Sequence, residues 1–264
     1  MRRIVVIATA LAVLIAAASA FAAGGFNTYT ASVKGSPNKA GSRKAPAAIR
    51  FTEKYVASGT NGNRTAPLTN IHSKIYGLKN SGKGFPTCSL AKIQAAKSDT
   101  VCPKGSLVAT GFIKALLGPT NDQSSTTNQT VVPCDPLLHA YNGGPGKVVY
   151  FFVDQAPHHL CAGGAVPTGF VGPFQGTIKT VGKNLVINTP IPSYVSFPLS
   201  GTEGSLTNET LHWLKVTRKV HGKTVAYTAS VGCKHGKRPY SHTFTAELNG
   251  QSQSETVSGS QKCK

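Results

Sequence analysis

The sequence is poor in acidic residues and in the residue patterns that mark common catalytic or metal sites. It has nine Asp and Glu residues against 28 Lys and Arg, with one methionine and one tryptophan in 264 residues. Met1 is the sole methionine and belongs to the export signal predicted below, so no axial methionine is expected for a copper site of the blue type. The motifs HExxH, CxxC and GxSxG are absent, which removes the usual signatures of zinc proteases, thioredoxin-like redox enzymes and α/β-hydrolases.

The shortage of carboxylates also limits acid–base chemistry. The nine acidic residues include no obvious couple of the kind that glycoside cleavage requires. Glu203 and Glu209 fall in a stretch that we assign to a loop, where a solvated carboxylate is the simplest interpretation. A triad assembled from distant strands has no local signature, and no catalytic residue is predicted.

The first 22 residues have the pattern of an export signal. Met1-Arg2-Arg3 gives a positive start, and residues 4–18 form an uncharged apolar run before a cleavage site within residues 20–23. The alternative is an uncleaved anchor, since residues 4–23 can span a bilayer core at about 1.5 Å per residue. We favour cleavage because the run is rich in alanine and no stop-transfer charge cluster follows it. No transmembrane span is predicted after removal of the signal.

Composition divides the rest of the chain into three parts. Residues 23–47 predict a flexible basic linker, residues 48–205 a main β domain, and residues 206–264 a C-terminal β-hairpin module packed on it. Removal of Arg2 and Arg3 leaves 26 basic against nine acidic residues, a formal charge of +17. Such a charge attracts polyanions within a screening length of about 8–10 Å, although it also serves solubility.

Alternating apolar and polar residues predict strands over most of the mature chain. Residues 49–57 and 71–76 are short runs rich in β-branched and aromatic side chains. Residues 148–153 are apolar throughout, which is typical of a strand covered on both faces at the centre of a core. We therefore predict an all-β fold of sandwich-like antiparallel sheets, stapled by disulfides and carrying one short helix.

The helix is predicted after Ser89, a residue type that accepts hydrogen bonds from the first backbone donors of a helix. It ends before the Lys97-Ser98-Asp99-Thr100 break. Cys88 and Cys102 flank this segment, and a bond between them would close a small helical loop, stabilising the fold by about 3 kcal/mol.

Two hairpins are predicted in the last third of the chain. A two-residue turn at His221-Gly222 places Val220 opposite Lys223 and brings apolar residues together on one face. Asn249-Gly250 forms the second turn, with the mostly polar residues 251–258 as an edge strand. This second hairpin returns the terminal cysteine towards Cys233.

An even number of cysteines behind an export signal predicts disulfide bonds rather than a metal site. Six thiols allow 15 pairings. The helix and the hairpin favour two bonds, Cys88–Cys102 and Cys233–Cys263, and the third follows by elimination. The six cysteines are Cys88, Cys102, Cys134, Cys161, Cys233 and Cys263.

Three short strings carry a resemblance to a known group of proteins. The strings are GFPTC at residues 84–88, VCPKGS at residues 101–106 and YNGG at residues 141–144. Together with the tail from Cys233 to Cys263, they resemble secreted β-rich proteins of high-GC Gram-positive (actinobacterial) soil bacteria, a group with no established activity. The resemblance covers most of the mature chain. It implies an exported, β-rich fold with disulfide bridges, and it transfers no functional residue.

Histidine and tryptophan give weak site signals. His158-His159 followed by Cys161 is the most ligand-like cluster among eight histidines, but its spacing matches no standard metal motif. We therefore predict no metal or cofactor. Trp213 is either exposed for stacking on a sugar or packed against the sheet, and the packed position is favoured.

Basic residues interleaved with aromatic ones give the candidate binding surface. Such an arrangement can follow a polyanion backbone, and solvated sheet faces produce the same pattern. No nucleic-acid motif accompanies it, so nucleic acid is not expected as the specific ligand. The candidates are Arg50, Lys54, Lys234, Lys237 and Arg238.

These observations predict a secreted or cell-wall-associated protein that is not an enzyme. We expect it to bind anionic polymers of the cell envelope through diffuse basic surfaces. One alternative is an extracellular hydrolase whose active site is dispersed over several strands. Another is a structural or adhesion subunit that assembles through sheet edges. The oligomeric state stays open.

Overall fold

The computed structural model describes residues 25–124, 131–166 and 171–264. They form an all-β, sandwich-like antiparallel fold with short helices and three disulfide bonds, as the sequence predicts. The predicted export signal, residues 1–22, lies outside the described residues.

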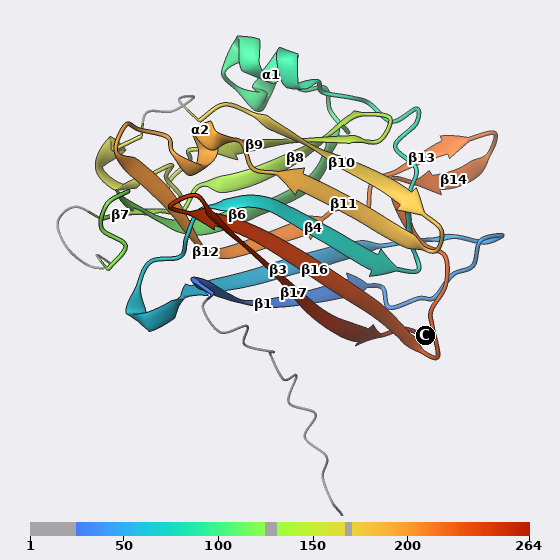
Figure 1. The fold of residues 1–264 in the computed structure, drawn as a ribbon. Helices are drawn as coiled ribbons and strands as arrows, with labels where there is room; N and C mark the ends of the chain where they lie inside the picture. Colours follow the sequence, from blue (N-terminus) through green and yellow to red (C-terminus); the bar gives the residue numbers. More distant parts are fainter. Residues whose placement is uncertain (1–24, 125–130, 167–170) are drawn as a thin grey trace, which may run out of the picture.

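One large antiparallel sheet curls back on itself, so that its first and last strands lie side by side (Figure 1). The order of its strands is β1, β3, β12, β6, β8, β9, β10, β11, β4, β16 and β17, with β7 paired to β6. The strands are β1 (Asn27–Ser36), β3 (Arg50–Gly59), β4 (Leu68–Tyr76), β6 (Leu107–Pro119), β7 (Val132–Cys134), β8 (Leu137–Gly144), β9 (Lys147–Val153), β10 (Phe174–Val181), β11 (Asn184–Pro190), β12 (Thr202–Trp213), β16 (Lys237–Leu248) and β17 (Gln251–Lys262).

Smaller elements complete the fold at its periphery. A hairpin pairs β13 with β14, and a three-stranded sheet has the order β2, β15, β5. The bounds are β2 (Ala47–Ala48), β5 (Leu78–Asn80), β13 (Thr217–Val220), β14 (Lys223–Ala226), β15 (Thr228–Ser230), α1 (Leu90–Ala96), α2 (Ser193–Ser196) and the 3₁₀ turns η1 (Thr60–Gly62), η2 (Asp99–Val101) and η3 (Ala162–Gly164).

Period-two alternation decides which side chains enter the interior. In β3, Phe51, Glu53 and Tyr55 are buried, whereas Arg50 and Lys54 are exposed. The sheet therefore encloses one face of each strand and leaves the other to solvent or to covering elements. An acidic residue at an inward position of an apolar ladder is unusual, because burial penalises its charged form.

β9 is the central strand that the apolar run predicted. Val148 and Tyr150 belong to the interior cluster of the curled sheet. On the opposite face, Val149 and Phe151 pack with Ile93 of α1 in a separate cluster. The strand is thus covered on both faces, which explains why its sequence shows no polar alternation.

The helix cap and all three predicted disulfide pairings are confirmed. The Ser89 side chain accepts a hydrogen bond from the backbone N–H of Lys92 at the start of α1. Each bridge closes a loop of 14 to 30 residues, which restricts the unfolded chain and stabilises the fold by about 3–4 kcal/mol in the chain-entropy estimate. The bonds are Cys88–Cys102, Cys134–Cys161 and Cys233–Cys263.

The two predicted hairpins are confirmed with their register. Val220 pairs with Lys223 across the His221-Gly222 turn. Leu248 pairs with Gln251 across the Asn249-Gly250 turn. The first residue of each turn has a positive φ, 47° for His221 and 51° for Asn249, and a glycine with positive φ follows. This geometry fits the right-handed twist of two-residue hairpins.

The predicted division of the chain differs from the structure in two places. The segment 23–47, expected as a linker, contains β1, which pairs with β3 along its whole length. The boundary expected at 205/206 lies inside β12, and strands from both sides of it share the large sheet. The signal for β1 was present, since Tyr29, Ala31 and Val33 alternate with polar residues at period two, but it stands beside the Gly- and Pro-containing residues 35–46, which have no such period.

A seam between β1 and β17 closes the sheet through side chains. The side-chain amide of Gln253 accepts from the backbone N–H groups of Phe26 and Asn27, both at 2.9 Å, and donates to the carbonyl of Asn27 at 2.8 Å. The amide of Gln261 makes a similar pair with Gly35, at 2.8 and 3.0 Å. Two glutamine amides therefore take the place that backbone groups occupy elsewhere in the sheet.

Candidate functional site

The curled sheet contains a partly open cavity of about 100 Å³. Side chains from β3, β4, β6, β8 to β12 and α2 line it, and most of them are aliphatic or aromatic. An engineered apolar cavity of about 150 Å³ accepts a benzene ring. The present space is smaller but partly open, so it can hold several waters or a small molecule that extends into the opening. The polar exceptions in the lining are few, and two of them are the carboxyl groups of Glu53 and Glu209.

Glu53 stands at one end of a buried chain of hydrogen bonds. Its carboxylate accepts from the indole N–H of Trp213 at 2.6 Å and from the hydroxyl of Tyr55 at 2.9 Å. The Tyr55 hydroxyl lies 3.0 Å from Ser73 Oγ, which lies 2.8 Å from Nδ1 of His242. Burial raises the pKa of Glu53, and hydrogen bonds, above all those from Trp213 and Tyr55, oppose this rise.

Ser73, His242 and Glu53 have the residue types of a hydrolytic triad but not its geometry. Ser73 and Glu53 approach the same ring nitrogen of His242. Glu53 Oε1 is 3.8 Å from Nδ1, the atom that contacts Ser73 Oγ. Nε2 of His242 is buried and has no hydrogen-bond partner among the described residues. Burial lowers the pKa of His242 to about 4, so the ring is neutral at pH 7. A triad base bridges nucleophile and acid through its two nitrogens, and this histidine does not.

Glu209 is the second carboxyl group of the cavity. It lies on β12 directly opposite Tyr55 of β3, with Ile113 of β6 on its other side. Glu53 is opposite Leu211, which makes the two glutamates diagonal neighbours on one face, about 7–8 Å apart at the backbone. Glu209 makes no hydrogen bond or ion pair with any residue that the structure describes. Burial raises its pKa to about 8, and the charge of Glu53 adds to this rise.

The prediction of a solvated loop is wrong for Glu203 and Glu209, because both lie in β12. A bulge between Leu206 and Asn208 shifts the phase of this strand, so the positions that face the cavity are Gly204 and Leu206 before the bulge and Glu209 and Leu211 after it. The signal was present in the second half, where Glu209, Leu211 and Trp213 follow one another at period two. Trp213 is buried, in agreement with the favoured interpretation.

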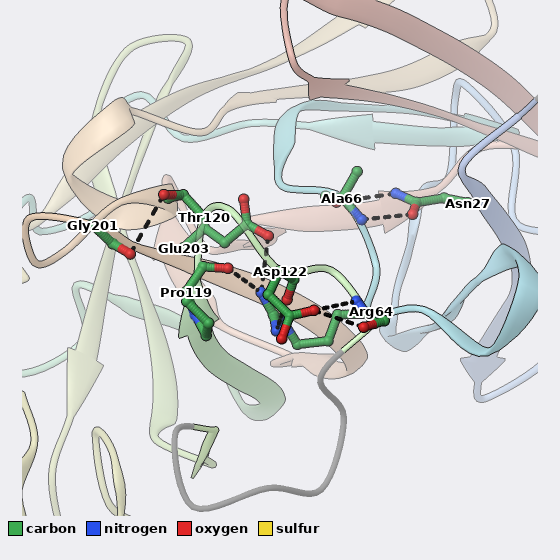
Figure 2. Close-up of polar contacts among 9 residues, drawn as sticks. Asn27, Arg64, Ala66, Pro119, Thr120, Asp122, Gly201 and Glu203 are labelled. Carbon is green, nitrogen blue, oxygen red and sulfur yellow. Dashed lines mark hydrogen bonds and ion pairs between the residues drawn. The ribbon is translucent and has the colours of Figure 1, made fainter.

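Glu203, the other glutamate of β12, is an anchor rather than a cavity group. Its carboxylate lies 3.2 Å from Nη2 of Arg64, and both side chains are buried (Figure 2). The guanidinium also donates to the carbonyls of Pro119 at 2.7 Å and of Asp122 at 2.8 Å. Arg64 thereby ties the loop after η1 to the ends of β6 and β12. A Cβ at Gly118 would lie 2.6 Å from this guanidinium, so the close approach requires glycine there.

The five candidates for polyanion binding do not form one group. Arg50, Lys54, Lys234 and Lys237 are exposed, but Arg238 is fully buried. The Arg238 guanidinium donates to the hydroxyl of Ser230 and contacts Sγ of Cys263 at 3.3 Å. Its burial lowers the pKa of Arg238 to about 10. The side chain cannot reach a ligand on the surface, and only the four lysine and arginine residues outside remain candidates.

The His158-His159-Cys161 cluster is used within the fold. His159 Nδ1 lies 2.9 Å from Asp154, and His158 Nδ1 lies 3.6 Å from Asp135. Cys161 is bonded to Cys134. No group of three His, Cys, Asp or Glu side chains with the spacing of a metal site occurs in the described part of the chain.

Comparison with known proteins gives no relative from which a role could be taken. No protein-family model matches the chain, and no curated protein matches it. No helix in residues 25–124, 131–166 or 171–264 is long and apolar enough to cross a membrane. The geometry of the cavity and the charge of the surface are therefore the observations from which function is inferred.

Proposed function

We propose that this is an exported, non-enzymatic binding protein that holds a small, largely apolar molecule inside its curled sheet. The observation that carries the proposal is the cavity, a space of about 100 Å³ in which aliphatic and aromatic side chains surround a few polar groups. Ligand sites have this composition, with polar groups that fix orientation and apolar walls that supply affinity. The hydrolase alternative is less well supported, because Ser73 and His242 lack triad geometry.

Export is part of the proposal and has two supports. The first is the N-terminal pattern of residues 1–22, and the second is the pairing of all six cysteines in disulfides. Disulfides form and persist in oxidising surroundings outside the cytosol. A wall-associated or extracellular location follows from both together.

A neutral aromatic probe tests the cavity. We expect benzyl alcohol to bind the full chain at a single saturable site, measured by isothermal titration calorimetry. Ala115 of β6 lines the cavity, so Ala115→Phe fills the space and lowers the affinity at least tenfold. The phenyl ring of the variant occupies the volume that the probe would take.

The matched control places the same substitution where no cavity exists. Ala95 is exposed on α1, and Ala95→Phe leaves the affinity for benzyl alcohol within twofold of the parent protein. If benzyl alcohol shows no saturable binding, or if Ala115→Phe binds it as well as the parent does, the cavity is not a ligand site.

A second function, the binding of anionic envelope polymers, is favoured by a separate observation. Arg50 and Lys54 project from the outer face of β3, and Lys234 and Lys237 are exposed near the β15–β16 turn. With a mature formal charge of +17, the surface attracts polyanions by long-range electrostatics. This role and the cavity use opposite faces of the sheet and do not compete.

Salt dependence tests the surface role. We expect the protein to be retained on a heparin matrix at 50 mM salt and released well below 1 M, because the screening length falls from above 10 Å to about 3 Å. The double variant Arg50→Gln with Lys54→Gln elutes at lower salt than the parent. Arg238→Lys serves as the comparison, since its buried position predicts no change in elution for the folded protein. Elution that is independent of salt contradicts the role.

A further inference from the structure

We propose that the molecule held in the cavity is an amine, whose ammonium group binds the carboxylate of Glu209 while its apolar body fills the rest of the space. This inference rests on the proposed function and names the chemical class of its ligand. Three observations support it: the charge of the cavity wall, the unpaired state of Glu209 and the apolar character of the remaining lining.

The wall carries two carboxyl groups and no base. Glu53 and Glu209 are diagonal neighbours on β3 and β12. No Lys, Arg or His belongs to the cavity lining in the part of the chain that is described. The one nearby base, His242, touches Glu53 from behind the lining and is neutral at pH 7. A positive charge supplied by a ligand would therefore meet two carboxyl groups and no like charge.

The two glutamates differ in what they already bind. Glu53 is held by Trp213 and Tyr55, so its hydrogen-bonding capacity is largely used within the protein. Glu209 has no such partner among the described residues and faces the cavity. An apolar ligand would displace water from this carboxyl group and offer it no hydrogen bond, which costs binding free energy. A ligand with a hydrogen-bond donor at this position avoids that cost, and a charged donor avoids it best.

Other ligand classes fit less well. A carboxylate or phosphate can accept a hydrogen bond from protonated Glu209, but its charge would lie beside Glu53 with no cation in the lining to balance it. A sugar or other polyol would place several hydroxyl groups against walls such as Leu138, Phe152 and Ile187, which offer no partners. A pure hydrocarbon would fill the space but leave Glu209 unpaired. An amine with a single aromatic or short aliphatic body places a positive charge near the acidic wall, gives Glu209 a partner and fills the apolar remainder of the cavity.

Binding of an amine moves a proton in a defined direction. Glu209 is protonated at pH 7 when the cavity is empty, because burial and Glu53 raise its pKa to about 8. The ligand arrives as an ammonium ion, the Glu209 carboxyl releases its proton to solvent, and an ion pair forms with no covalent change. The groups that face Glu209 are Glu53 and Tyr55 of β3 and Tyr150 of β9, while β6 presents Ile113. The tyrosines stay protonated at this pH, since burial raises the pKa of each.

Three isosteric probes test the inference on the full chain: benzylamine, benzyl alcohol and benzoate. We expect benzylamine to bind at least tenfold more tightly than benzyl alcohol at pH 7, because a hydrogen bond to a charged group changes the affinity by this factor or more. We expect no binding of benzoate. Titrations in phosphate and in Tris, which differ in ionisation heat, give a release of close to one proton per benzylamine bound. Glu209→Gln reduces the ratio of the two affinities to about one and abolishes proton release. Glu247→Gln makes the same change at an exposed position of β16 and keeps both the preference for benzylamine and the proton release.

Each outcome bears on one of the two proposals. Equal affinities for benzylamine and benzyl alcohol overturn the amine assignment and leave the cavity as a neutral ligand site. A preference for the amine that persists in Glu209→Gln overturns the role of Glu209, and tighter binding of benzoate overturns the charge argument. If none of the probes binds, both this inference and the proposed function are wrong. Proton release by the parent protein is independent of how well any variant folds.

Discussion

At pH 8 the Glu209→Gln variant has a free energy of unfolding about 3–5 kcal/mol higher than the parent protein, and at pH 4 the two are equally stable. Burial holds the pKa of Glu209 at about 8 in the folded chain, against an ordinary value of 4.5. Between these values the unfolded chain gives up the proton and the folded chain keeps it. The parent protein therefore loses stability as pH rises from about 4.5 to 8, whereas a glutamine cannot ionise.

Urea unfolding at several pH values measures this difference. Trp213 is the one tryptophan of the chain and is buried, so its fluorescence reports unfolding without a label. Glu247→Gln is the control, because that side chain is exposed on β16 and should change stability by less than about 0.5 kcal/mol. A Glu209→Gln variant that is equally stable at pH 4 and pH 8, relative to the parent, would contradict the raised pKa. A residue that destabilises the empty protein in this way is typical of a functional position.

Arg64→Ala lowers the free energy of unfolding by about 3–5 kcal/mol, since it leaves the Glu203 carboxylate buried without its counter-charge. Arg64 lies 3.2 Å from that carboxylate and also satisfies the carbonyls of Pro119 and Asp122. Burial raises the pKa of Glu203, and the guanidinium opposes this rise. Loss of the arginine removes the opposing effect, so Glu203 must take up a proton or draw in water.

Thermal unfolding followed by circular dichroism tests this anchor. For a chain of this size the melting temperature should fall by about 10 °C or more. Arg50→Ala removes the same side chain from an exposed position and should leave the melting temperature nearly unchanged. The double variant Arg64→Met with Glu203→Met should recover much of the loss, because it removes both buried charges together. An Arg64→Ala protein as stable as the parent would mean that the ion pair contributes nothing net.

The sequence was a good guide wherever one local pattern determined the structure. The turns at His221-Gly222 and Asn249-Gly250 set the register of two hairpins, because only certain residues adopt the positive φ that these turns need. The N-cap at Ser89 marked the helix, and the apolar run at residues 148–153 marked the strand covered on both faces. Two of the disulfide pairings followed from the helix and the second hairpin, and the third, Cys134–Cys161, followed by elimination.

The cavity could not be predicted, because it depends on contacts between strands that are distant in sequence. Glu53 and Glu209 are 156 positions apart and become neighbours only when β12 pairs with β3. The burial of Arg238 is likewise a tertiary effect, since Lys-Arg pairs beside aromatic residues are also found on solvated faces. The usable signal was an acidic residue at an inward position of a period-two ladder, as at Phe51-Thr52-Glu53-Lys54-Tyr55. Such a residue is either a buried anchor or part of a site, and sequence alone does not separate these.

Point mutations can weaken the closure of the sheet, because side chains and not backbone groups join β1 to β17. Backbone pairing between strands is the same for almost every residue type, so a substitution rarely unfastens it. Gln253 and Gln261, by contrast, hold their neighbours through groups that a single codon change removes. Substitutions at these two positions can weaken the closure of the sheet without changing any side chain of the cavity lining. The closure of the sheet and the composition of the cavity wall can therefore diverge independently in sequence.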